Sequence, residues 1–325
     1  MLSILRKSID TVRNFSRERN RPFSFSLHAS AQQANSVVGG FVVNRSLFIA
    51  AIVLSCLCVP LRGQNVQVSE WTPLYIGIDR ATGSIDGPDY SQAYAVRVDL
   101  RAPGISIYTA PHQGSLNTVA STTSSFLTKF GLQVAVNANF FAPCCNAAPE
   151  EKTVLGLAVS DGNVVAVPNS IPGQNAGLLI TRKNQASISD TGEQMDLSNV
   201  FNAVTGSGIV VQDGVNVGSQ TPYGDGADPN PRTSVGLSQD NRYLYIVVID
   251  GRQPGYSIGT KSSETADLML AFGAYTAINL DGGGSTDLVE DDGQGGAKIV
   301  NRPSGEAERY DANQLGIRAR PLGDD

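Results

Sequence analysis

The most chemically distinctive stretch of this sequence lies at residues 279–286, where Asn-Leu-Asp-Gly-Gly-Gly-Ser-Thr follows an apolar segment. Glycine adopts backbone conformations that other residues avoid, so three successive glycines can turn consecutive N–H groups toward one point. Such a nest binds anions, and Ser285 adds a hydroxyl group. The stretch lacks the lysine of a P-loop and the spacing of a dinucleotide fingerprint, so nucleotide binding is not indicated. We therefore predict an anion-binding loop at Gly282, Gly283 and Gly284.

Asp281 directly precedes these glycines. A carboxylate in contact with a phosphate would repel it by about 4 kcal/mol at an effective dielectric constant of about 20. In such a place Asp281 must be protonated, paired with an arginine or bound to a cation. A carboxyl group that holds a proton beside a phosphate is suited to general acid or base catalysis. The sequence therefore predicts Asp281 as the main catalytic group.

Two arginines lie at the ends of expected strands. Arg232 follows a proline at the start of one strand, and Arg252 follows Asp250 and a glycine after the apolar run at 243–249. A planar guanidinium group can bind a phosphate or carboxylate through two parallel hydrogen bonds. We expect Arg232, its neighbour Thr233 and Arg252 to contact the same anion.

Further polar candidates are scattered along the chain. Asn137 follows a buried strand, Glu264 lies in the first turn of an expected helix, and Arg302 and Arg309 lie near the C-terminus. We expect the two arginines to be additional anion-binding groups.

Composition excludes several function classes. The chain has 325 residues and only two histidines, His28 and His112, which excludes a multi-histidine metal site and argues against a Ser-His-Asp triad. It has 24 Lys and Arg against 30 Asp and Glu; residues 1–64 hold eight basic and two acidic residues, which leaves 16 basic and 28 acidic residues in 65–325. The field of so acidic a body repels nucleic acid, so we expect no nucleic-acid partner.

Short strands dominate the elements that must position these groups. Alternating or apolar runs predict two hairpins, at 155–167 and 233–249. Helices are expected at 117–130 and 261–272, the second capped by Ser262 or Ser263, and the strand at 276–280 after it suggests a parallel crossover. We predict an α+β (mixed α/β) fold: a single domain over residues 91–322, with many short strands in mixed sheets and two or three helices, preceded by a linker at 65–90.

The N-terminal part has a different composition. Residues 47–59 carry no charge, but thirteen helical residues span only about 20 Å, against about 30 Å for a bilayer core. We expect 47–64 to be a cleaved signal peptide or a short signal anchor with membrane attachment through 47–61. The basic residues 1–46 are then either disordered or upstream of the true start. Either alternative predicts an extracytoplasmic protein that is secreted, periplasmic or membrane-anchored.

Two cysteines are adjacent in the body of the chain. A bond between Cys144 and Cys145 would close a small, distorted ring. An exported protein tolerates such a bond beside a functional site. The sequence leaves a disulfide and two reduced thiols as open alternatives.

Six motifs, in order along residues 90–320, resemble the phosphodiester glycosidase family, which includes the catalytic domain of the mannose 6-phosphate uncovering enzyme. The motifs are Asn-Ala-Asn-Phe-Phe at 137–141, Arg-Thr-Ser-Val-Gly at 232–236, Val-Ile-Asp-Gly-Arg-Gln-Pro-Gly-Tyr-Ser at 248–257, Glu264, Asn-Leu-Asp-Gly-Gly-Gly-Ser at 279–285 and Asn-Arg-Pro-Ser at 301–304. The resemblance implies a hydrolase that cleaves between a sugar anomeric carbon and a phosphodiester oxygen.

That reaction requires a held phosphate and a carboxyl group at the reacting bond. We expect Asp281 to act as acid or base, with Asp250 or Glu264 as a second carboxyl group. The expected phosphate-binding set is Arg232, Thr233, Arg252, Gly282, Gly283, Gly284 and Ser285, with Asn137, Asn279 and Arg302 orienting these groups or the sugar.

Two alternatives stay open. In a metal-assisted phosphodiesterase, Asp250, Asp281 and Asn279 would hold Ca²⁺ or Mg²⁺ through oxygen ligands, whereas the glycosidase requires no cofactor. In a non-catalytic module, the same loops would bind cell-envelope polysaccharide. The expected partner is a sugar-phosphate diester or phosphoglycan.

Overall fold

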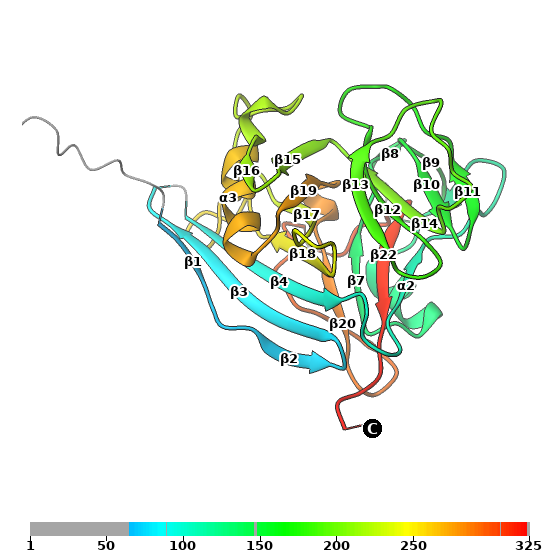
Figure 1. The fold of residues 1–325 in the computed structure, drawn as a ribbon. Helices are drawn as coiled ribbons and strands as arrows, with labels where there is room; N and C mark the ends of the chain where they lie inside the picture. The colour runs from blue at the N-terminus through cyan, green and yellow to red at the C-terminus, as the bar shows by residue number, and fades with distance from the viewer. Residues whose placement is uncertain (1–64, 89, 146–147, 306, 324–325) are drawn as a thin grey trace, which may run out of the picture. The chain divides into compact units, whose positions relative to one another are not determined.

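The computed structural model describes residues 65–88, 90–145, 148–305 and 307–323. This part of the chain is rich in strands, which form four sheets, with two α-helices beside them (Figure 1). The segments expected at 1–46 and 47–64 lie outside the described residues. Within the described ranges, neither α-helix has the length and apolar character needed to cross a membrane.

The largest sheet has nine strands, and several of the predicted site residues lie at the ends of its strands or just beyond them. Its strand order is β1-β3-β4-β18-β17-β19-β15-β16, and β2 pairs with β3. The strands are β1 (Asn65–Val68), β2 (Thr72–Tyr75), β3 (Ile78–Asp86), β4 (Ser91–Asp99), β15 (Gly208–Gln212), β16 (Val215–Asn216), β17 (Arg232–Leu237), β18 (Tyr243–Ile249) and β19 (Thr276–Asn279).

Three smaller sheets complete the described structure. One has the order β21-β20-β7-β22-β5, with β5 (Ser106–Thr109), β7 (Val134–Asn137), β20 (Leu288–Asp291), β21 (Ala297–Ile299) and β22 (Gln314–Arg318). Another has the order β11-β10-β14-β12-β13, with β10 (Ala158–Ser160), β11 (Asn163–Ala166), β12 (Ala176–Ile180), β13 (Ala186–Asp190) and β14 (Asn202–Gly206). The third joins β6 (Thr118–Val119), β9 (Glu151–Val154) and β8 (Phe141–Ala142).

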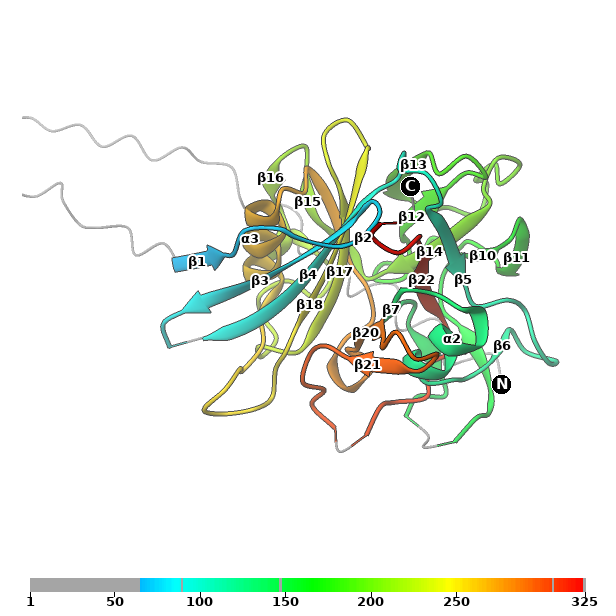
Figure 2. The ribbon, with the colours of Figure 1, turned by 90° about the horizontal axis from the view of Figure 1, so that it is seen from below.

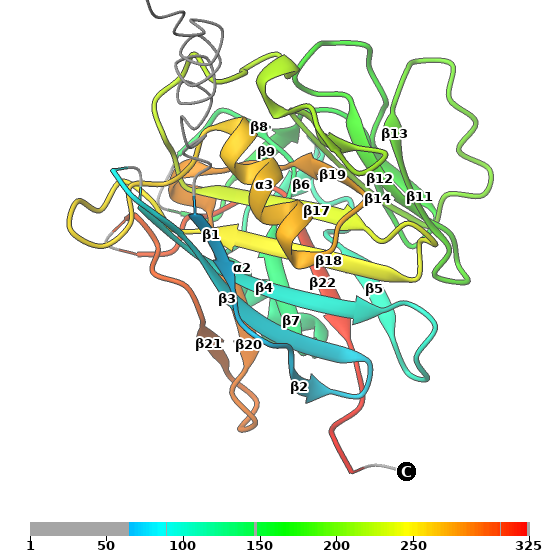
Figure 3. The same ribbon diagram turned by 60° about the vertical axis from the view of Figure 1, so that its left-hand side comes forward.

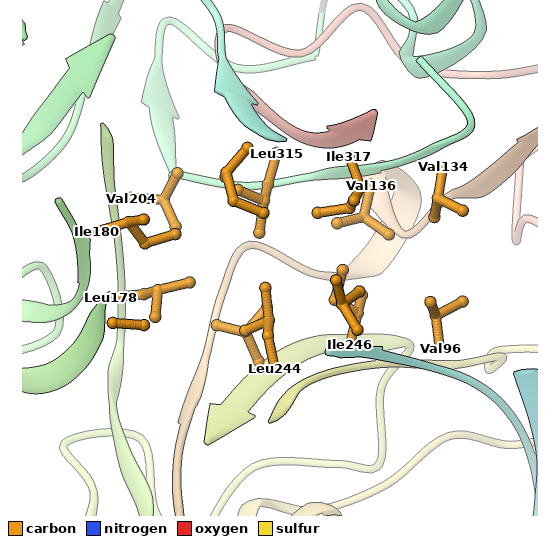
Figure 4. Close-up of a cluster of buried hydrophobic side chains, with 14 of the residues drawn as sticks. Val96, Val134, Val136, Leu178, Ile180, Val204, Leu244, Ile246, Leu315 and Ile317 are labelled. Atoms are coloured by element: carbon orange, nitrogen blue, oxygen red, sulfur yellow. The ribbon is translucent and has the colours of Figure 1, made fainter. Parts of the chain in front are cut away.

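Strand β18 shows how the large sheet is buried. Leu244, Ile246 and Val248 face a core shared with the two five-stranded sheets, whereas alternate residues such as Val247 and Ile249 face α3 (Ser262–Phe272). Figures 2 and 3 show α3 against one face of this sheet, with the smaller sheets on the other side. Figure 4 shows the side chains of the shared core pointing toward one another. Both faces of the sheet are therefore covered.

This burial explains one error of the sequence analysis. Runs such as 243–249 are apolar throughout, which is typical of parallel strands covered on both faces. Every strand pair in the described residues is nevertheless antiparallel, so the expected mixed sheets are wrong. Strands β18 and β19 run in the same direction, as the crossover predicts, but β17 lies between them.

The expected linker at 65–90 is also wrong, because these residues form β1, β2 and β3. Strand β3 has nine residues and pairs with β4 along most of its length. Its apolar side chains, Ile78 and Ile85, are buried but lie far apart among polar residues. That spacing conceals the strand in the sequence.

The two helices follow local rules at their ends. Helix α2 (Thr123–Phe130) is shorter than predicted, begins after the Thr122 cap and ends at Gly131 in the left-handed conformation. Helix α3 begins after Lys261 rather than at either predicted serine cap, and ends at Gly273 with φ 109°. The side chain of Glu264 accepts a hydrogen bond of 2.7 Å from the Lys261 N–H, which closes the first turn.

Candidate active site

Three strand ends of the large sheet meet at one edge. Arg232 at the start of β17 pairs with Ile249 at the end of β18, and Ser234 pairs with Asn279 at the end of β19. The loops that leave these ends help to line a pocket of about 410 Å³. Eight of the predicted site residues line this pocket: Arg232, Arg252, Asn279, Asp281, Gly282, Gly283, Gly284 and Arg309.

The Asp281 carboxyl group is held by two donors. Its Oδ1 accepts from the Gly282 N–H at 2.8 Å, and its Oδ2 accepts from the Ser285 hydroxyl at 2.8 Å. Burial raises the pKa of Asp281 to about 6, although the two hydrogen bonds and the charge of Arg309 oppose this rise. A carboxyl group with a pKa in this range exchanges protons readily near neutral pH, which is what general acid or base catalysis requires.

The three glycines allow close approach by neighbouring groups. A Cβ atom at Gly282 would lie 2.6 Å from the Pro231 carbonyl oxygen, and one at Gly283 would lie 3.0 Å from Arg252 Nη2. At Gly284 a Cβ atom would overlap the Arg309 guanidinium group. The triple glycine is thus the surface on which two guanidinium groups lie.

The anion nest expected from consecutive N–H groups is not what the structure contains. The Gly282 N–H donates to Asp281, and the Gly283 N–H donates to the Pro231 carbonyl at 2.9 Å. Residues Gly283–Ser285 instead form a short 3-10 turn. Because protein acceptors occupy two of the three N–H groups, the positive charge at this turn comes mainly from arginine side chains.

Three guanidinium groups line the pocket: Arg232, Arg252 and Arg309. None of them belongs to an ion pair among the described residues. Arg232 donates to the Thr260 carbonyl at 3.0 Å, and Arg252 donates to the Asn230 side chain at 2.9 and 3.1 Å. Burial, followed by the like charge of Arg252, lowers the pKa of Arg232. The pocket therefore holds positive charge that forms no ion pair with the carboxylates that the structure describes.

Arg309 connects this charge to Asp281. Its Nη1 donates to the Ser285 hydroxyl at 3.2 Å, and that hydroxyl donates to Asp281 Oδ2. The same Nη1 lies 4.0 Å from the Sγ of Cys144. Cys144 and Cys145 form a disulfide, which answers the alternative left open by the sequence, and Cys145 lines the pocket.

Asn137, Thr233 and Ser285 are buried around the pocket. Asn137 Nδ2 donates to the Asp281 carbonyl at 2.7 Å, and its Oδ1 accepts from the Thr233 hydroxyl at 2.6 Å. These bonds tie the end of β7 to β17 and to the start of the glycine turn. Asn279, which does line the pocket, donates to the Ser207 hydroxyl at 2.9 Å.

Asp250 and Arg302 lie outside the lining of this pocket. Asp250 is 1% exposed and accepts hydrogen bonds from Asn301 Nδ2, the Arg302 N–H and the Tyr256 hydroxyl at 2.9–3.1 Å. The Arg302 side chain stacks on the Tyr256 ring at 4.9 Å. Burial raises the pKa of Asp250, and these hydrogen bonds oppose the rise. Its observed contacts join two loops.

Glu264 also lies outside the lining, buried at the first turn of α3. Both predicted second carboxyl groups, Asp250 and Glu264, thus accept hydrogen bonds from backbone N–H groups. In the part of the chain that the structure describes, no three His, Cys, Asp or Glu side chains are arranged to hold a metal ion. The catalytic and metal-binding roles themselves stay predictions.

A sequence profile described as phosphodiester glycosidase matches residues 130–318. The chain belongs to the phosphodiester glycosidase family. The resemblance carried by the six motifs is thereby confirmed. The matched range contains every residue predicted for the site.

Solved structures share the fold of this family member. The catalytic domain of zebrafish N-acetylglucosamine-1-phosphodiester alpha-N-acetylglucosaminidase, auto-inhibited by its pro-peptide, matches with a TM-score of 0.59 and 20% identity over 79% of this chain and 88% of that one. A predicted exported protein of Burkholderia pseudomallei matches with a TM-score of 0.59 and 15% identity over 79% and 97%. A Synechocystis protein matches with a TM-score of 0.55 and 16% identity over 80% and 64%. No curated protein sequence is significantly similar.

The sequence analysis missed two buried carboxyl groups of this family member. Burial raises the pKa of Asp287 to about 8, and it raises the pKa of Asp311 well above its usual range. The charge of Arg309 lowers the pKa of both, as it does for Asp281. Asp287 follows the glycine turn and Asp311 follows Arg309 by two residues, but only the folded chain shows that both are buried.

Proposed function

We propose that this phosphodiester glycosidase hydrolyses the bond between a sugar anomeric carbon and a phosphodiester oxygen. The observation that carries the proposal is one pocket that contains the Asp281 carboxyl group and three guanidinium groups, none of which forms an ion pair with a described residue. Arg232 and Arg309 are half-buried, and Arg252 is exposed at the mouth of the same pocket. Half-buried positive charge without an ion pair favours an anionic ligand, and guanidinium groups match phosphate oxygens in geometry.

In the proposed reaction, Arg232, Arg252 and Arg309 bind the two free oxygens of the phosphodiester. Asp281, ionised above its pKa of about 6, takes a proton from a water molecule as that water attacks the anomeric carbon. The carbon–oxygen bond breaks and its electron pair passes to the phosphate. The products are a free sugar and a phosphate monoester, whose added negative charge the guanidinium groups stabilise.

The neighbouring residues hold Asp281 in place. The Ser285 hydroxyl and the Gly282 N–H fix its two oxygens, and Asn137 fixes the backbone of the same residue. Arg309 in turn holds Ser285. This chain of contacts restrains the carboxyl group beside the bound phosphate, and positioning of this kind contributes strongly to catalysis.

We also propose that the enzyme acts on an extracytoplasmic glycan or glycoconjugate. The uncharged segment at 47–59 and the Cys144–Cys145 disulfide support this location, because disulfides persist in oxidising compartments. Among proteins of the same fold, one is a predicted exported protein.

The experiment is a screen of the purified protein against sugar-1-phosphodiesters that differ in sugar and alcohol. We expect a free sugar and a phosphate monoester from at least one of them, identified by mass spectrometry. Asp281→Asn protein, prepared in the same way, should release product at least about 100-fold more slowly. Equal product release by both proteins would remove Asp281 from the mechanism.

A further inference from the structure

The pocket beside Asp281 contains a second, uncharged set of lining residues. Phe140, Tyr223, Ala227 and Cys145 line it together with the three arginines. They come from the segment after β7, the segment after β8 and the loop that follows the short helix Gly218–Gln220. A phosphate needs only the charged set, so the uncharged set is available for another part of the ligand.

Tyr223 is the more exposed of the two aromatic residues in this uncharged set. It is 55% exposed, and it is the one aromatic residue among the large, exposed hydrophobic side chains of the described residues. A large apolar side chain left in water loses the stabilisation that burial provides. Because Tyr223 also lines the pocket, its exposed ring is a candidate contact for a ligand.

The Tyr223 ring is also held in place. A Cβ atom at Gly173 would lie 3.0 Å from the Tyr223 ring, and Gly173 has φ 86°, a conformation that favours glycine. The ring thus packs directly on the backbone of the loop that contains Gly173. A ring fixed in this way loses little further conformational entropy when a ligand covers it.

We propose that Tyr223 is a specificity-determining residue whose ring packs against the pyranose ring of the substrate while the arginines hold its phosphate. This inference rests on the proposed function. A pyranose in its chair form presents a face of C–H groups, which suits a flat aromatic surface. Its hydroxyl groups lie around the edge of the ring, where they stay in contact with polar groups or water.

The substrate of the proposed function has two parts, a phosphate group and a sugar joined to it, and the inference assigns Tyr223 to the ring of that sugar. A phosphate that carries only a small alkyl group contacts the arginines but leaves Tyr223 uncovered. Affinity should then depend on the sugar through Tyr223 and on the phosphate through the guanidinium groups. These two dependences are separable by mutation.

The test measures binding by isothermal titration calorimetry with inorganic phosphate, methyl phosphate and the α-1-phosphates of glucose, galactose, mannose and N-acetylglucosamine. At least one sugar 1-phosphate should bind the wild-type protein about tenfold more tightly than methyl phosphate, a difference of about 1.4 kcal/mol. Aromatic packing supplies free energies of this size. In Tyr223→Ala protein the ratio should fall to about twofold or less.

Two variants serve as controls. Tyr223→Phe keeps the ring and should keep the ratio, because the proposed contact uses the ring face. Ile171→Ala shortens an exposed apolar side chain that does not line the pocket, and it should also keep the ratio. Inorganic phosphate should bind all four proteins with the same affinity within about twofold.

The possible failures are distinguishable. A ratio that Tyr223→Ala leaves unchanged overturns the role of Tyr223 while the phosphate site stands. Wild-type protein that binds no sugar phosphate more tightly than methyl phosphate overturns the two-part substrate class. Protein that binds neither inorganic phosphate nor methyl phosphate overturns the proposed function, and this inference with it.

Discussion

Asp250 and Asp281 occupy similar places in the sequence but different environments in the fold. Each follows an apolar strand directly or nearly so, and each precedes glycine. Asp250 is 1% exposed and accepts hydrogen bonds from three different residues. Asp281 accepts from two residues and lines the pocket that contains three guanidinium groups.

The difference gives a reason to propose Asp281, rather than Asp250, as the reactive carboxyl group. Every donor at Asp250 is supplied by protein loops, so its observed contacts hold those loops together. At Asp281 the two donors fix the orientation of the carboxyl group while the residue stays accessible from the pocket. The place of Asp281 in the lining of the pocket, rather than its sequence motif, favours it as the reactive group.

The largest expected effect comes from exchanging each carboxyl group for an amide. Asp281→Asn should lower kcat by about 10²- to 10⁴-fold, because the general base is lost, and its melting temperature should stay close to wild type. Asp250→Asn should instead lose about 1–3 kcal/mol of stability, because the new amide N–H₂ group faces buried donors. Steady-state kinetics and thermal unfolding of both variants check this contrast. Equal losses of activity at full stability would break it.

A smaller effect is expected from Gly284→Ala. The added methyl group would displace the Arg309 guanidinium from the glycine turn, and with it the support of Ser285 and Asp281. We expect kcat/KM to fall by about 10- to 100-fold, since misplacement of about 1 Å has effects of this size. Gly226→Ala is a matched control, because nothing lies within 4 Å of a Cβ atom there. A Gly284→Ala enzyme as active as this control would exclude Arg309 from the active arrangement.

The pH dependence of activity tests the electrostatic link between Arg309 and Asp281. Because the base must be ionised, kcat/KM should fall as the pH drops through about 6. The charge of Arg309 lowers this pKa, so Arg309→Gln should move the acid limb upward by about 1 unit. Arg309→Lys keeps the positive charge and should move the limb less. Coinciding acid limbs in all three enzymes would contradict the link.

The last prediction concerns stability rather than catalysis. Asp287 has a pKa of about 8 in the folded protein, against about 3.9 when unfolded. The folded state then binds the extra proton between these values, so its stabilisation is complete below about pH 4 and is lost as the pH rises through about 8. Asp287→Asn has no proton to lose, so its melting temperature should fall less than that of wild type between pH 5 and 8.5.

Asp213→Asn, a change in an exposed turn, is the control for this experiment and should retain the wild-type pH dependence. If the melting temperatures of Asp287→Asn and wild-type protein changed with pH in the same way across this range, Asp287 would be ionised in the folded protein. Asp287 would then keep its charge despite its burial.

Much of the fold follows from local patterns in the sequence. The alternation around residues 239–242 predicts the β17–β18 hairpin, and Gly131 and Gly273 end the helices where glycine is expected. The polar strand β3 does not follow from such patterns, because its burial depends on β4 and on α3 covering the sheet. The sequence also does not show that β17 lies between β18 and β19, because β18 is apolar on both faces, as in a parallel sheet.

The candidate site was also predictable in part from local patterns in the sequence. Arg232, Arg252 and Asp281 lie at strand ends, and the pairing of β17 with β18 and β19 brings those ends together. The sequence does not distinguish Arg302 from Arg309, because a few residues of irregular loop decide which side chain reaches the glycine turn. The burial of Asp287 and Asp311 arises only from tertiary packing.

The bond that the enzyme breaks tests the account most directly. Hydrolysis of a sugar-1-phosphodiester in water enriched in ¹⁸O labels whichever product receives the water oxygen. Attack at the anomeric carbon leaves the released phosphate monoester without ¹⁸O, which is the result that we predict by mass spectrometry of that product. A phosphate monoester that carries one ¹⁸O atom would show attack at phosphorus, as in the metal-assisted phosphodiesterase alternative, and would contradict the proposed glycosidase.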